Sequence, residues 1–513
     1  MRTVTVTGEA LALEDLVAVA RGQAGAVMGA GVADRMAPSR AVVADAVDQD
    51  KVMYGITTGF GALADTHVGR EDLEQMQLAL VRSHSAGVGE PLPDDVVRGL
   101  LLLRARTLTV GYSGVRVELP AKLLELLEHD LLPVIPGKGS VGASGDLAQL
   151  AHLAQPLVGE GRLRRLGDTD LRGRPAAELL SEEGVEPLVL APKEGLSLIN
   201  GTEPMQVLLA LAVDDIGVLL KVADIAAAMS VEALLGTDKP YDERVQVIRP
   251  HPGQLASASN LRRLLAGSPL VASHRESDHA VQDSYCLRCA PQVHGAVRDV
   301  HAHARRVIDI ELGSVVDNPV IVPDGEVMST GNFHGEPLAF AGDMLAMAVS
   351  ELASISERRT DRMLDPAFSR SLPAFLARNP GLNCGFMIAQ YTAASLVSEN
   401  KVLAHPSSVD TIPTSGNQED HVSMGWTSMR KLREVVTNVR HVLAVEVLAA
   451  SQALDLRADV AAPGAASGAV HAAVRAAVPV MDEDRNVSDQ LETVAAMLRE
   501  LVGAAEAAVG VLD

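Results

Sequence analysis

The stretch from Met205 to Leu235 constrains the fold of this chain most strongly. It is the most apolar long run in the sequence, and charged residues interrupt it, among them Asp214, Asp215, Lys221 and Asp224. A membrane-spanning helix carries few or no charges, so this run predicts a buried helix of a bundle instead. We therefore expect a mainly α fold built on long helices.

The composition agrees with packed helices. Hydrophobic residues make up 47% of the 513 residues but aromatic residues only 2%, so the core must be aliphatic and rich in alanine. Such a core favours helices over a β-sandwich. The net charge of −22 argues against nucleic acid or an anionic membrane as a partner. A small anionic substrate stays possible, because one local arginine can override the global field.

The three cysteines do not form a disulfide framework in a chain of this length. Cys286 and Cys289 make a C-x-x-C pattern, which can indicate zinc or redox chemistry, but no second pair accompanies it. We interpret them as buried thiols, and a reducing cytosol fits the three cysteines, of which Cys384 is the third. Residues 1–8 alternate like a strand and do not resemble a signal peptide.

The best candidate for a domain boundary follows Asn200. Residues 1–200 read as a mixed, loop-rich N-terminal domain, and residues 201–513 as a long-helix bundle domain with peripheral C-terminal helices. Residues 188–200 are expected to form a β-hairpin with its turn near residues 193–195. Periodicity predicts helices at 13–20, 71–84, 97–108, 121–132, 205–235, 338–357, 385–401 and 431–456, then a C-terminal helical hairpin.

The loop from Gly142 to Asp146 carries the most unusual chemistry. Its sequence is Gly-Ala-Ser-Gly-Asp, and helical spacing begins directly behind it, so Asp146 is expected to be the N-cap of a helix. The positive end of that helix would polarise an electrophile or anion held just before it.

Three interpretations compete for this loop. It is a plain glycine turn, or it presents a serine nucleophile, although the hydrolase pattern G-x-S-x-G has Asp146 in place of its last glycine. In the third, the Gly145 nitrogen attacks the Ala143 carbonyl, and loss of two waters, one taking the Ser144 hydroxyl, leaves a methylidene-imidazolone electrophile. Only small residues permit such a close approach of the backbone.

The stretch from Gly139 to Ala148 resembles the cofactor loop of the aromatic amino-acid ammonia-lyases. The resemblance continues through most of the chain, from Tyr54 to Gly425. It implies a bundle of the aspartase/fumarase-like type and a 4-methylidene-imidazol-5-one formed autocatalytically from residues 143–145, with no metal expected. It also implies a homotetramer with shared active sites.

The resemblance assigns roles to residues outside the loop. Tyr54, in the glycine-rich segment 53–61, matches the base that removes a β-proton while the substrate amine reacts with the electrophile. Tyr285 matches a second tyrosine that supports the amine and the cofactor. The matching substrate-binding residues are Arg288 for the carboxylate, Asn200 and Gln282 as orienting amides, and Phe333 beside the cofactor.

Two positions indicate the substrate. The pair Ser83-His84 is similar to that of the histidine ammonia-lyases, whereas phenylalanine and tyrosine lyases resemble Phe-Leu and His-Leu there. Glu419, which we count among the catalytic residues, agrees, because an imidazole offers a nitrogen for a carboxylate to bind. Thr57 and Glu203 depart slightly from the histidine pattern, and Thr57 resembles the plant phenylalanine enzymes.

The sequence therefore predicts elimination of ammonia from L-histidine to give trans-urocanate. The nearest alternative is a tyrosine or phenylalanine ammonia-lyase or an aminomutase of the same family. A non-catalytic helical assembly protein and a metal- or thiol-dependent enzyme are alternatives from other classes. If either of these two alternatives holds, His84 is an ordinary core histidine and Tyr54 packs as part of a lid.

Overall fold

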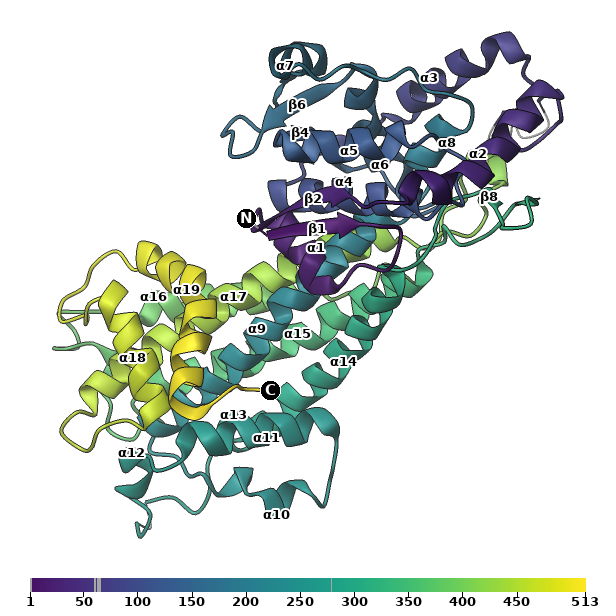
Figure 1. Cartoon of the computed structure of the whole chain (residues 1–513). Helices are drawn as coiled ribbons and strands as arrows, with labels where there is room; N and C mark the ends of the chain where they lie inside the picture. The colour runs from purple at the N-terminus through teal and green to yellow at the C-terminus, as the bar shows by residue number, and fades with distance from the viewer. Residues whose placement is uncertain (1, 60, 62–65, 278) are drawn as a thin grey trace. The chain divides into compact units, whose positions relative to one another are not determined.

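The computed structural model describes residues 2–59, 61, 66–277 and 279–513. The chain divides into two compact units, which are described separately (Figure 1). Unit 1 comprises residues 1–211, 305–342 and 406–430, and unit 2 comprises residues 212–304, 343–405 and 431–513. The chain passes from one unit to the other within four long helices, α9 (Glu203–Ala233), α14 (Ala290–Glu311), α15 (Glu336–Leu364) and α17 (Gly425–Leu456), and once more between residues 405 and 406.

Unit 1 mixes short helices with small sheets. Its centre is α4 (Asp94–Thr109), in which every residue from Val96 to Thr109 is buried. The first strand, β1 (Arg2–Val6), pairs in parallel with β2 (Ala24–Met28). The other helices are α1 (Leu13–Ala20), α2 (Val32–Asp48), α3 (Leu73–His84), α5 (Glu118–Glu128), α6 (Leu147–Ala154), α7 (Ala176–Glu183) and α8 (Glu194–Ile199).

The remaining strands of unit 1 are short and antiparallel. β3 (Val88–Pro91) pairs with β5 (Pro136–Lys138), and β4 (Leu131–Pro133), β6 (Arg162–Arg165) and β7 (Arg174–Pro175) form a second sheet in that order. β8 (Val320–Ile321) pairs with β9 (Val327–Met328).

Unit 2 is a bundle of long helices with smaller ones around it. Its shorter helices are α10 (Glu243–Gln246), α11 (Pro252–Leu265), α12 (Pro269–Ala272), α13 (Tyr285–Arg288) and α16 (Met387–Leu403). The C-terminal pair, α18 (Ala465–Ala477) and α19 (Ser488–Val509), lies together in yellow in Figure 1.

A buried polar network joins the four long helices inside unit 2. Asp224 of α9 bonds His294 of α14 at 2.7 Å, and Arg359 of α15 donates to Glu446 of α17 at 2.5 and 2.9 Å. Burial opposes ionisation of Asp224, yet the Arg298 guanidinium and His294 lower its pKa to about 2. Buried charges that are paired in this way fix which helix faces meet.

In the described part of the chain one helix, α15, is long and apolar enough to cross a membrane. Its apolar window is 61% buried against the rest of the protein, as in the core helix of a globular bundle.

The predicted mainly α fold with long helices is confirmed, and α1 and α9 lie where periodicity placed them. The predicted hairpin at 188–200 is wrong, because residues 194–199 form α8. Lys193 caps this helix in a left-handed conformation and is fully buried, with its ammonium 3.0 Å from Asp317. The helix predicted at 121–132 ends at Glu128, since residues 131–133 pair with β6.

The compact units also differ from the predicted division after residue 200. Unit 1 includes residues 305–342 and 406–430 besides the N-terminal part. The second of these segments contacts the loop at residues 142–146, because Ser423 Oγ donates to the Gly142 carbonyl and the Met424 N–H donates to the Val141 carbonyl.

Candidate active site

Two backbone hydrogen bonds with Gly201 hold the loop at residues 142–146. The Gly201 N–H donates to the Ser144 carbonyl at 3.3 Å, and the Asp146 N–H donates to the Gly201 carbonyl at 2.9 Å. Gly145 has φ +75°, and a Cβ on it would overlap the Gly201 carbonyl oxygen. Only glycine fits at this position, so the loop is pressed against residue 201 with its backbone exposed to close approach.

Asp146 precedes α6, as predicted, but its side chain does not cap that helix. One carboxyl oxygen accepts a bond from Ser140 Oγ at 2.7 Å, and the other accepts from the Met205 N–H at 3.1 Å in the first turn of α9. Complete burial raises the pKa of Asp146 to about 7. The acid therefore sits next to the loop in a form that exchanges a proton near neutral pH.

Residues 422–424 also pack against the loop. Ala143 packs in a small apolar cluster with Val422 and Met424, and the Met424 N–H donates to the Val141 carbonyl at 2.9 Å. Ser423 Oγ donates to the Gly142 carbonyl at 3.3 Å. Ala143 is thus buried, whereas Ser144 is only half-buried.

Tyr54 lies in a segment of turns, as its glycines predicted. Its phenol oxygen accepts a hydrogen bond from the Gly61 N–H at 3.3 Å. A Cβ on Gly61 would come within 2.6 Å of Ser415 Oγ, so this segment lies against the loop that carries Glu419.

His84 and Glu419 also lie near one another in unit 1. His84 ends α3, and its Nδ1 bonds the Leu80 carbonyl at 3.0 Å, which assigns the proton to Nδ1 and leaves Nε2 as an acceptor. Burial lowers the pKa of His84, while the Leu80 carbonyl and the Glu419 carboxylate act in the opposite direction. Glu419 accepts a bond from Thr414 Oγ1 at 2.7 Å, which fixes one oxygen.

Asn200 presents an unpaired acceptor. Its Nδ2 donates to the Asn318 carbonyl at 2.8 Å, and its Oδ1 is buried with no hydrogen-bond partner among the described residues. The Asn200 carbonyl accepts from Arg104, which pairs at 2.6 Å with fully buried Glu203. Phe333 is half-buried in the turn before α15.

The other three predicted residues, Gln282, Tyr285 and Arg288, belong to unit 2. The Arg288 guanidinium carbon lies 4.6 Å from the Tyr285 ring centroid, a cation–π contact on one face of α13. Arg288 Nε is buried and has no hydrogen-bond partner among the described residues. Tyr285 is 71% exposed.

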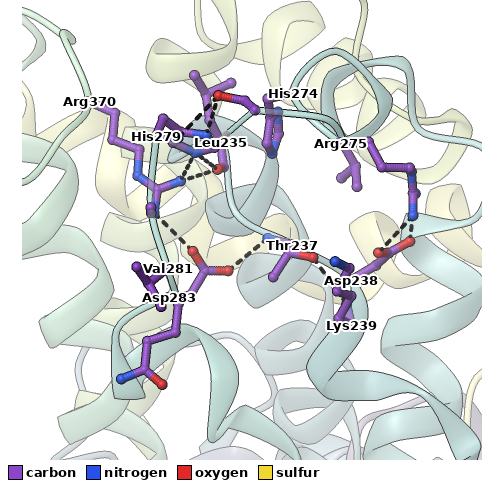
Figure 2. Close-up of a pocket in the computed structure, with 14 residues that line it drawn as sticks. Leu235, Thr237, Asp238, Lys239, His274, Arg275, His279, Val281, Asp283 and Arg370 are labelled. Carbon is purple, nitrogen blue, oxygen red and sulfur yellow. Dashed lines mark hydrogen bonds and ion pairs between the residues drawn. The ribbon is translucent and has the colours of Figure 1, made fainter.

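Gln282 lines a cavity of about 110 Å³ in unit 2 (Figure 2). Asp283 anchors this segment, because its carboxylate accepts from the Thr237 N–H at 2.7 Å and from Arg370 at 3.0 Å. Figure 2 shows Asp283 between these two partners, with Arg370 also reaching His279.

Sequence reasoning missed several residues that shape the loop in unit 1. Gly201 supplies both backbone bonds, Ser140 binds Asp146, and Ser423 holds Gly142. Ser140 lay inside a stretch that the sequence singled out, but nothing in the residue order signals partners so distant in sequence as Gly201 and Ser423.

Solved structures with a similar helical fold include an ammonia-lyase and an aminomutase. The family model described as aromatic amino acid lyase matches residues 11–476. The chain belongs to the aromatic amino acid lyase family.

Individual relatives agree. The histidine ammonia-lyase of Deinococcus radiodurans is 55% identical over 87% of this chain and 84% of its own length. The structure of histidine ammonia-lyase from Trypanosoma cruzi superposes with a TM-score of 0.91 at 42% identity, covering 99% of this chain and 96% of that one. Tyrosine aminomutase from Streptomyces globisporus gives 0.93 at 38% identity, with both chains fully covered. The predicted resemblance to the ammonia-lyases is confirmed.

Proposed function

We propose that this chain is a histidine ammonia-lyase that converts L-histidine to trans-urocanate and ammonia without oxidation. The observation that carries the substrate assignment is the placement of His84 beside Glu419 in unit 1. Both side chains can hydrogen-bond an imidazole, and relatives named histidine ammonia-lyase are similar over nearly the whole chain.

The residues at 143–145 fit the proposed 4-methylidene-imidazol-5-one. Gly145 leaves no space for a side chain, Ala143 is buried in an apolar cluster, and Ser144 is half-buried, so its hydroxyl can leave toward solvent. Asp146 and Ser140 stand beside the loop as a proton-exchanging pair for the loss of water. When formed, this group supplies an electrophile that turns the substrate amine into a good leaving group.

The chain's own residues bind the substrate and move its proton. Tyr54 takes the β-proton at its phenol oxygen, and the Gly61 N–H bonded to that oxygen stabilises the phenolate. Arg288 holds the carboxylate with a planar guanidinium, and Tyr285 supports the amine. Asn200 offers the buried Oδ1 as an acceptor for an N–H donor.

The imidazole ring lies between His84 and Glu419 in this proposal. The Nε2 of His84 accepts from a ring N–H, and the Glu419 carboxylate binds the other side of the ring. Phe333 and Gln282 complete the substrate's surroundings. A site built for hydrogen bonds rejects a benzene ring by as much as about 10⁴-fold, because its own polar groups would be left unpaired.

We further propose a cytoplasmic homotetramer in which each site takes residues from more than one copy, with no nucleic acid or membrane as partner. Large apolar side chains are exposed at helical spacing on α15 and α16, where an interface would cover them; they are Phe340, Met344, Met347, Ile388 and Tyr391. In this assembly a neighbouring copy completes the active site to which the exposed Tyr285 belongs.

Complementation tests the shared site. Tyr54→Phe and Tyr285→Phe each inactivate every site in a homogeneous tetramer. Co-assembled, the two variants regain part of the parent activity if Tyr54 and Tyr285 of one site come from different copies. Mixed tetramers as inactive as either variant alone would contradict the sharing of these two residues.

A spectrophotometric panel with histidine, tyrosine and phenylalanine tests the function itself. We expect turnover of histidine to the conjugated acid and near-inertness toward the other two, with Ser144→Ala folded and assembled but inactive. A kcat/KM ratio near one would refute the histidine assignment. Formation of a β-amino acid instead of the unsaturated acid would make the chain an aminomutase, as the tyrosine aminomutase of similar fold is named.

A further inference from the structure

Three side chains in unit 1 that the proposed reaction does not use come together before and beside α15. They are His334 in the turn before the helix, Glu336 as its first residue, and His421 in the loop that carries Glu419. One potential ligand atom from each lies within 4.8 Å of the other two. The two histidines are 87 residues apart in sequence, so no spacing motif could have indicated the cluster.

One carboxylate oxygen of Glu336 has no hydrogen-bond partner among the described residues. Its Oε2 is buried and makes no hydrogen bond with the described residues. The start of α15 accounts for a negative charge at this position, because the helix N-terminus favours an acid. It does not account for an unpaired buried carboxylate oxygen, which costs free energy unless a cation or donor meets it.

The imidazole of His334 places a second acceptor, Nδ1, near Glu336 Oε2. His334 Nε2 lies 3.3 Å from the His421 carbonyl, and since a carbonyl only accepts, the proton is on Nε2. Nδ1 is then a lone pair, and it lies 4.0 Å from Glu336 Oε2. A cation placed between these two acceptors would pair with both of them.

The third imidazole is placed to join them. The His421 ring stacks on the His334 ring with centroids 5.7 Å apart and planes inclined by 15°. His421 is exposed, so its ring can turn without disturbing the core. Zinc–nitrogen and zinc–oxygen bonds are about 2.0–2.2 Å long, so the 4.0 Å pair can hold an ion after a small closure.

We propose that His334, Glu336 and His421 form a binding site for a divalent transition metal of the zinc type, with the fourth position open to water. Two imidazoles and one carboxylate suit Zn²⁺ and Co²⁺, whereas Mg²⁺ and Ca²⁺ prefer all-oxygen ligands. The ion ties the loop of Glu419 to the first turn of α15. The proposal rests on the ligand geometry alone and stands whether or not the chain acts on histidine.

Cobalt titration of the chelator-treated full-length protein tests the site. We expect one Co²⁺ per chain with the visible absorption of a four-coordinate nitrogen and oxygen site, displaced by Zn²⁺. His421→Ala, which changes an exposed side chain, and Glu336→Gln should each weaken binding by at least about tenfold. His441→Ala is the matched control, because His441 also faces a glutamate, Glu492 at 3.2 Å, but has no third potential ligand within the described part of the chain.

Three results would overturn the proposal. The first is absence of saturable Co²⁺ binding to the parent protein, and the second is equal binding by His421→Ala and His441→Ala. The third is an intense sulfur-to-cobalt band, which would place the ion at Cys286 and Cys289 instead. Circular dichroism of each variant shows whether weaker binding comes with lost structure, and His421→Ala decides the question if Glu336→Gln does not fold.

Discussion

Replacing Gly145 by alanine tests the clamped loop with a predictable cost. The left-handed φ of +75° costs a residue with a side chain about 1–2 kcal/mol. The new Cβ also overlaps the Gly201 carbonyl, so the 2.9 Å and 3.3 Å backbone bonds to residue 201 must open. Each is worth about 0.5–1.5 kcal/mol, which brings the expected loss to roughly 2–5 kcal/mol.

The variant Gly167→Ala separates the cost of a left-handed φ from the cost of a steric overlap at the new Cβ. Gly167 has a similar φ of +84°, but a Cβ there meets nothing within 4 Å, so only about 1–2 kcal/mol is expected. Urea unfolding at equal protein concentration should show Gly145→Ala as the less stable variant by about 1–3 kcal/mol. Mass spectrometry of the loop peptide should show that Gly145→Ala retains both waters, whereas Gly167→Ala loses them as the parent does.

Equal stability of the two variants would refute the reasoning that close packing against Gly201 fixes the loop. A fully dehydrated loop in Gly145→Ala would equally show that the tight approach is unnecessary for ring closure.

Three further outcomes are expected. Tyr54→Phe should lower kcat by roughly 10²–10⁴-fold with little effect on binding of a non-reactive histidine analogue, whereas a rise in KM alone would place the base elsewhere. Glu419→Gln should reduce kcat/KM for histidine by at least about tenfold and leave stability unchanged, as urea unfolding can check. Because burial raises the pKa of Asp146 from 3.8 to about 7, the unfolded chain releases this proton first as pH rises. The free energy of unfolding should therefore fall by roughly 3–4 kcal/mol between about pH 4 and 7, and Asp146→Asn should remove that part of the slope.

Local patterns predicted much of the fold because they reflect local physics. The apolar period of α9 depends on neighbours three and four residues away, and the helix is present. The hairpin predicted for residues 188–200 is wrong because the conformation of this segment depends on partners distant in sequence. Lys193 is buried only because Asp317 lies 3.0 Å away, and no local pattern encodes that pair.

The candidate site shows the same limit. Family resemblance gave the roles of Tyr54, His84 and Glu419, and unit 1 contains all three. The bond from Gly61 to the phenol and the unpaired oxygen of Asn200 arise from the folded loops, so only the structure could reveal them. The raised pKa of Asp146 likewise follows from its burial, which its position before a helix does not disclose.

The mass of the proteolytic peptide that contains residues 142–146 tests the central claim most directly. The account predicts a deficit of two waters in the parent protein, localised to residues 143–145, and its absence in Ser144→Ala, which has no hydroxyl to lose. A parent peptide with the full mass of the encoded sequence, from protein that still deaminates histidine, would contradict it.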